Sequence, residues 1–119
     1  MQIETLNNNG QSMAYVHTNT PIITDVQSAL DLMATVRYEA GSDAIIVNKE
    51  ALVEEFFDLK TRLAGEIIQK YVNYGIRMAI IGDFSGYTSR ALHDFIYESN
   101  QGKNLYFVSD VKEAQIKLG

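Results

Sequence analysis

The segment from Asp83 to Ser89 carries the side chains of this sequence that are best suited to bind a ligand. It follows Met78–Ile81, four consecutive apolar residues that predict a central strand covered on both faces. In open α/β sheets, ligands bind at the carboxyl ends of such strands. A carboxylate would accept hydrogen bonds there, hydroxyls would donate them, and a tyrosine ring would offer a stacking surface. These candidate residues are Asp83, Ser85, Tyr87, Thr88 and Ser89.

A purely structural role for the same segment is the alternative. Thr88 or Ser89 would cap the helix that follows, and Asp83 would accept hydrogen bonds from the amides of the turn. The glycines of this segment lack the spacing of a phosphate-binding Walker loop or of a dinucleotide fingerprint. The sequence leaves the binding role and the structural role open.

A second candidate site is the start of the helix that we expect from Asp58 to Tyr74. Asp58, Lys60 and Thr61 lie at its amino end, where free amides and the helix dipole favour anions. We consider an anion or phosphate pocket here. The alternative is that Asp58 is simply the N-cap, a role that contributes about 1 kcal/mol.

Other familiar catalytic and metal-binding patterns are missing from the sequence. There is no cysteine, and the two histidines, His17 and His93, have no set of spaced ligands around them, so we expect neither a metal nor a cofactor. Ser85, His93 and Asp83 could be combined into a triad on paper. The chain lacks the G-x-S-x-G turn that exposes a nucleophilic serine, and we reject the triad.

The pattern of elements predicts the α/β class with a mixed sheet of about five strands and four helices in the order ββαβαβαβα. Asn9-Gly10 suits the tight turn of an opening hairpin, and strands alternating with helices then indicate a parallel run. We expect one domain over residues 1–119. The predicted buried strands are 44–47, 78–81 and 105–108, and the predicted helices begin near residues 24, 58, 89 and 110.

Composition limits the classes of partner. The net charge is −5, and the basic residues are scattered rather than gathered on one stretch, which argues against nucleic-acid binding. No stretch approaches the roughly 18 apolar residues that a membrane span needs. The first ten residues lack the basic and apolar parts of a secretion signal, so we expect a cytoplasmic protein.

Several long phrases of the chain resemble a bacterial family known as domain of unknown function 4180. The phrases are DLKTRLAGEI, YGIRMAIIGDFS, LHDFIYESNQG and the closing YFVSD. The likeness covers nearly the whole chain. It implies a bacterial origin and supplies no biochemical activity.

The order of elements also resembles the STAS fold of anti-sigma-factor antagonists. In those domains an Asp-Ser-Ser-Gly-Leu stretch opens the helix after the third strand, and one of its serines is a regulatory phosphorylation site. Here Asp58 matches the aspartate, no serine stands next to it, and Thr61 supplies the nearest hydroxyl, displaced by one place. The resemblance implies a STAS-like fold.

Together these features favour a non-catalytic regulatory module that binds a protein or a small ligand. The alternative is a small enzyme with Asp83 or Asp58 as the acid or base and Ser85 or Thr61 as a donor, which requires a deep pocket and a carboxylate of raised pKa. Homodimerisation through exposed apolar residues is a further hypothesis. Most aromatic residues should pack in the core, and we expect one of Phe56 and Phe57 to face a partner.

Overall fold

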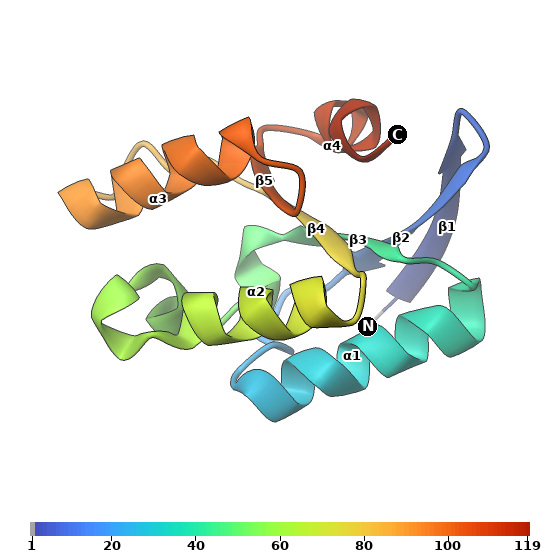
Figure 1. Cartoon of the computed structure of the whole chain (residues 1–119), viewed down its shortest axis with the longest axis horizontal. Coiled ribbons are helices and arrows are strands. Elements are labelled where there is room, and N and C mark those ends of the chain that lie inside the picture. Colours follow the sequence, from blue (N-terminus) through green and yellow to red (C-terminus); the bar gives the residue numbers. More distant parts are fainter. Residues whose placement is uncertain (1) are drawn as a thin grey trace.

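The computed structural model describes residues 2–119, and its centre is one mixed sheet of five strands (Figure 1). The strands are β1 (Gln2–Asn8), β2 (Gln11–His17), β3 (Ala44–Asn48), β4 (Arg77–Ile81) and β5 (Leu105–Val108). Their order across the sheet, β1-β2-β3-β4-β5, is also their order along the chain. β1 pairs antiparallel with β2, whereas β2 to β5 run parallel. The carboxyl ends of the four parallel strands therefore lie along one edge.

A tight turn at Asn9 and Gly10 joins β1 to β2, as the sequence predicts. Both residues take a positive φ, 54° at Asn9 and 79° at Gly10, which asparagine and glycine tolerate best. Asn8 lies opposite Gln11 in the ladder, so the loop has two residues.

Three helices cover one face of the sheet and a fourth covers the other. The helices are α1 (Val26–Ala40), α2 (Leu63–Asn73), α3 (Arg90–Gln101) and α4 (Val111–Leu118). The larger core lies between the sheet and α1, α2 and α3, and the smaller core lies under α4. Figure 1 shows α4 on the opposite side of the strands from α1 and α2. This arrangement confirms the predicted α/β class, with its five-stranded mixed sheet and four helices.

A buried hydrogen bond fixes α1 against α2. The side chain of Tyr71 on α2 is buried, and its hydroxyl donates to the carbonyl oxygen of Ala29 on α1 at 2.7 Å. Burial raises the pKa of this phenol well above its ordinary value of 10.0. Tyr71 is therefore protonated at neutral pH and can donate this hydrogen bond.

The start of α2 differs from the prediction. α2 begins at Leu63 rather than near Asp58, because Arg62 takes a left-handed φ of 66° that separates it from the preceding turn. The connection from β3 instead contains three 3-10 helices, η1 (Lys49–Ala51), η2 (Glu54–Phe57) and η3 (Leu59–Thr61). The aromatic residues also depart from expectation at three exposed positions, Tyr38, Tyr74 and Tyr97.

Candidate binding cleft at the strand ends

The candidate site lies where β3 and β4 end side by side. Because Asn48 pairs with Ile81 at the ends of these neighbouring parallel strands, the segments that follow them start next to each other. One segment is the run of 3-10 helices over residues 49–62, and the other is the loop over residues 82–89. The Lys49 ammonium donates to the carbonyl oxygen of Asp83 at 3.4 Å and so connects the two segments directly.

Gly82 is the residue that lets the two segments come this close. A Cβ atom at this position would lie 2.9 Å from Cβ of Lys49, 3.1 Å from its Cδ and 3.2 Å from Cζ of Phe84. Cβ of Lys49 is attached to the backbone and has little freedom to move aside. A side chain at position 82 would therefore push the two segments apart.

Aromatic rings form the wall between the two segments. The rings of Phe57 and Tyr87 are stacked with centroids 5.4 Å apart, and the centroid of Phe84 lies 6.1 Å from that of Phe57. Phe56 meets Phe57 edge to face at 5.2 Å, and both are buried. Neither ring is therefore the exposed aromatic that the sequence predicts, because η2 directs both side chains into the core, although Phe57 also contributes to the lining of the cleft described below.

Tyr87 joins this wall to the charged residues. Its hydroxyl donates to the Glu54 carboxylate, at 2.8 Å from Oε1 and 3.1 Å from Oε2. The Lys49 ammonium lies 4.9 Å from the centroid of the same ring, a cation–π contact. Partial burial, the hydrogen bond to Glu54 and the negative charge of Glu54 and Glu50 raise the pKa of Tyr87 well above its ordinary value of 10.0. The phenol is thus held protonated and oriented.

Asp83 and Ser85 bind one another rather than pointing into an open space. Oδ1 of Asp83 accepts from the Ser85 hydroxyl at 2.7 Å and from the Ser85 amide at 3.0 Å. These two hydrogen bonds, with a smaller effect from the Lys49 charge, lower the pKa of Asp83 below its ordinary value of 3.8. Further along the loop, Ser89 caps α3 by accepting from the Leu92 amide at 3.2 Å, and the exposed Thr88 precedes that cap.

The second group of predicted site residues lies one turn before α2. Asp58 caps the short helix η3 by accepting from the Lys60 amide at 3.2 Å, and the Lys60 side chain is exposed. Thr61 Oγ1 lies 2.7 Å from the carbonyl oxygen of Glu55 and accepts from the Leu63 amide at 3.2 Å. Asp58 and Thr61 are occupied by local backbone groups, and the three predicted residues do not form the start of α2.

A cleft of about 370 Å³ opens between η2 and the loop after β4. Three of the predicted residues line it, namely Asp58, Tyr87 and Ser89, so the structure brings parts of both predicted segments together. Lys60, Thr61, Asp83, Ser85 and Thr88 lie outside its lining. The residues that complete the lining are Glu54, Glu55 and Phe57.

The lining residues Glu54, Glu55 and Phe57 were not identified as a site from the sequence. Both glutamates are exposed, as is typical of a solvated acidic surface. The available signal was that they belong to the segment that follows β3. Together with Asp58 they place three carboxylates beside the stacked rings of Phe57 and Tyr87, which suits a positively charged group attached to a flat or apolar one.

Metal-binding clusters and membrane-spanning helices are both absent from the part of the chain that the structure describes. Among residues 2–119, no group of three or more histidine, aspartate or glutamate side chains is arranged to hold a metal ion. Within the same residues, every helix is too short or too polar to cross a membrane.

The chain belongs to the family described as domain of unknown function (DUF4180), whose family model matches residues 8–118. None of the curated proteins and none of the solved structures matches this chain.

Proposed function

We propose that this member of the domain of unknown function 4180 family is a non-catalytic regulatory module that binds its partner in the cleft at the strand ends. The partner inserts a cationic group with a flat or aliphatic stem, such as an arginine side chain of another protein. The proposal includes the STAS-like character, the bacterial origin and the cytoplasmic location that the sequence suggests.

The observation that carries this proposal is the pairing of the stacked Phe57 and Tyr87 rings with three carboxylates around one cleft. A guanidinium group stacks on aromatic faces and forms paired hydrogen bonds with carboxylates. The hydrogen bond from Tyr87 to Glu54 holds one ring and one carboxylate in place before a ligand arrives, which lowers the entropic cost of binding.

The alternative, a small enzyme that uses Asp83 or Asp58 as its acid or base, is not favoured. It requires a carboxylate with a raised pKa, whereas the pKa of Asp83 is lowered by its bonds to Ser85. Asp83 also lies outside the lining of the cleft. An enzyme would still be indicated if Asp83→Ala left the stability intact and abolished the turnover of a metabolite.

A titration with n-butylguanidinium, followed by NMR of the backbone amides, tests the cleft directly. We expect concentration-dependent shifts confined to residues 54–58 and 87–89, and no such shifts with n-butanol, which has the same stem without the charge. In the variant Glu55→Lys, which reverses a charge of the cleft at an exposed position, the shifts should be lost. Equal shifts in wild type and variant, or shifts with n-butanol, contradict a cation site.

A pull-down from a bacterial lysate tests the wider role. Proteins captured by the wild type should be retained by Glu98→Lys, a matched charge reversal at an exposed position on α3, and lost with Glu55→Lys and with Tyr87→Ala. If Glu55→Lys captures the same proteins as Glu98→Lys, the cleft is not the binding surface.

A further inference from the structure

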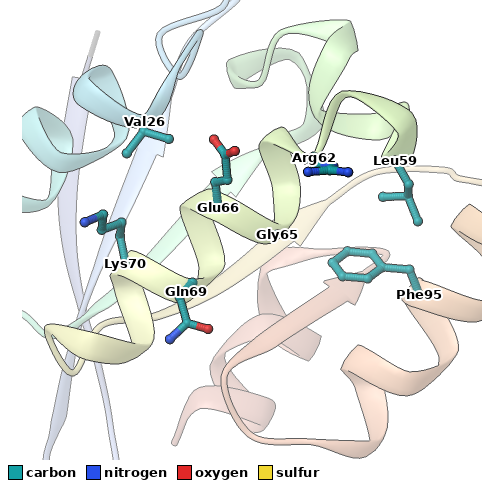
Figure 2. Close-up of a pocket in the computed structure, with 8 residues that line it drawn as sticks. All are labelled: Val26, Leu59, Arg62, Gly65, Glu66, Gln69, Lys70 and Phe95. Atoms are coloured by element: carbon teal, nitrogen blue, oxygen red, sulfur yellow. The ribbon is translucent and has the colours of Figure 1, made fainter.

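A second hollow lies away from the cleft, over the outer face of α2. It is a groove of about 810 Å³, open to solvent. None of the residues that line it lines the cleft at the strand ends. Figure 2 shows its lining, which consists of Val26, Leu59, Arg62, Gly65, Glu66, Gln69, Lys70 and Phe95.

Apolar side chains flank the groove, and a glycine of α2 is among its lining residues. Val26 from α1 contributes on one side of α2, and Leu59 and Phe95 contribute on the other (Figure 2). Gly65 lies on the exposed face of α2, and a Cβ atom there would meet nothing within 4 Å. Another helix could therefore approach the backbone of α2 closely at this point.

The exposed face of α2 carries a regular ladder of charges. Arg62, Glu66, Lys70 and Tyr74 follow one another at intervals of four residues. Glu66 and Lys70 lie on one ridge of α2, and Arg62 and Tyr74 are its N-cap and C-cap residues at the two ends of that ridge. All four are exposed, and the Tyr74 ring is an exposed aromatic at 51%. The single ion pair among residues 2–119 joins other residues, so the three charges of this ridge are unpaired within the chain.

We propose that a second copy of this chain covers the groove, with the two α2 helices packed antiparallel about a two-fold axis near Ile68. In that arrangement Glu66 of each copy faces Lys70 of the other. Arg62 of each copy then reaches Tyr74 of the other, where its guanidinium can stack on the phenol ring.

The occupant is a second copy because the ridge is complementary to itself. When two copies pack antiparallel, each glutamate at position 66 faces a lysine at position 70 of the other copy. Each arginine at position 62 then faces the tyrosine ring at position 74 of the other copy. A two-fold contact of this kind uses the same patch on both subunits and closes at two copies. A ridge of a single charge sign would repel its own copy and would need a different partner.

Charge reversal provides a test that separates this interface from any other. Glu66→Lys alone sets two lysine side chains against each other at both symmetry-related contacts. Lys70→Glu alone sets two glutamates against each other in the same way.

We expect the wild type to sediment as a dimer, and each single reversal to raise the Kd of the dimer by more than about tenfold. Mixing the two single variants should restore a dimer that contains one copy of each. One copy then has two positive groups at positions 66 and 70 and the other has two negative groups, so both symmetry-related contacts join opposite charges. The double variant Glu66→Lys with Lys70→Glu should also dimerise, since it exchanges the charges without changing their complementarity.

Analytical ultracentrifugation over a range of concentrations measures each of these masses, and circular dichroism checks that the exposed substitutions leave the helices intact. A wild type that remains monomeric up to about 1 mM overturns the proposal. So does a dimer whose Kd is the same in all variants, because it must then use another face. A double variant that stays monomeric overturns the antiparallel pairing of Glu66 with Lys70. The outcome is independent of the n-butylguanidinium titration, which concerns the other site.

Discussion

Replacing Gly82 by alanine tests whether the two walls of the cleft depend on a close backbone approach. The added methyl group would lie 2.9 Å from Cβ of Lys49, which is shorter than real Cβ contacts. The end of the Phe84 ring, at 3.2 Å, can move aside at little cost. Lys49 begins η1, which ends in the buried Ala51, so Cβ of Lys49 cannot move aside without moving the backbone.

The expected cost follows from two opposing contributions. Overpacking of this kind costs about 1–3 kcal/mol. Alanine also lowers the entropy of the unfolded chain relative to glycine, which raises the free energy of unfolding by about 0.4–1 kcal/mol. Because φ of Gly82 is not in the left-handed region, no backbone strain is added. We therefore expect Gly82→Ala to lower the free energy of unfolding by about 1–2 kcal/mol.

Urea denaturation followed by tyrosine fluorescence measures this change, with Gly86→Ala as the matched control. With m of about 1–3 kcal/mol/M, the midpoint of Gly82→Ala should fall by about 1 M. Gly86 lies in the same loop, and a Cβ atom there would meet nothing within 4 Å, so alanine at this position should raise the free energy of unfolding by about 0.4–1 kcal/mol. A Gly82→Ala variant as stable as the wild type would refute the close approach of the two segments.

Two further predictions concern the hydrogen bonds of the fold and of the loop. Tyr71→Phe removes the hydrogen bond to the carbonyl oxygen of Ala29 and should lower the free energy of unfolding by about 1 kcal/mol. Thermal denaturation measures this change, and an unchanged stability would mean that the hydrogen bond is absent in solution. The pKa of Asp83 is lowered in the folded state, so its contribution to stability is complete above the ordinary value of 3.8 and is lost as the pH falls through the folded pKa. NMR titration should show the pKa of Asp83 rising toward that ordinary value in Ser85→Ala, and an identical pKa in both proteins would show that Ser85 is not the cause.

The sheet and helices were predictable because each strand carries its own signal. The runs at residues 44–47, 78–81 and 105–108 are continuously apolar, which is typical of strands buried on both faces, and all three are buried strands in the structure. The hairpin was predictable from Asn9 and Gly10, since these residue types tolerate the positive φ that the turn requires.

The path of residues 49–62 was not predictable from local pattern. Asp58 resembles a helix cap and does cap a short 3-10 helix, but the α-helix starts five residues later. The separation depends on the left-handed φ of Arg62, a conformation for which arginine has no preference. Short 3-10 segments also lack the longer periodicity that would have placed Phe56 and Phe57 in the core.

The candidate site was predictable in its location and only partly in its members. The strand-end rule pointed to the loop that contains Tyr87 and Ser89. The contributions of Glu54, Glu55 and Phe57 depend on how residues 49–62 fold back beside that loop, which is a tertiary effect. Conversely, Asp83 and Ser85 had the right chemistry but satisfy each other, and no sequence pattern distinguishes a self-satisfied pair from a free one.

Strands that are neighbours in the sheet are also consecutive along the chain. Folding of the sheet therefore requires no pairing between strands that are far apart in the sequence. Each parallel ladder closes a loop that contains a single α-helix, which keeps the entropy of closure modest. We expect folding to add one strand and one helix at a time. Damage to one crossover should then affect chiefly the units on either side of it, so that the exposed edge strand β1 can fray without disturbing the cleft.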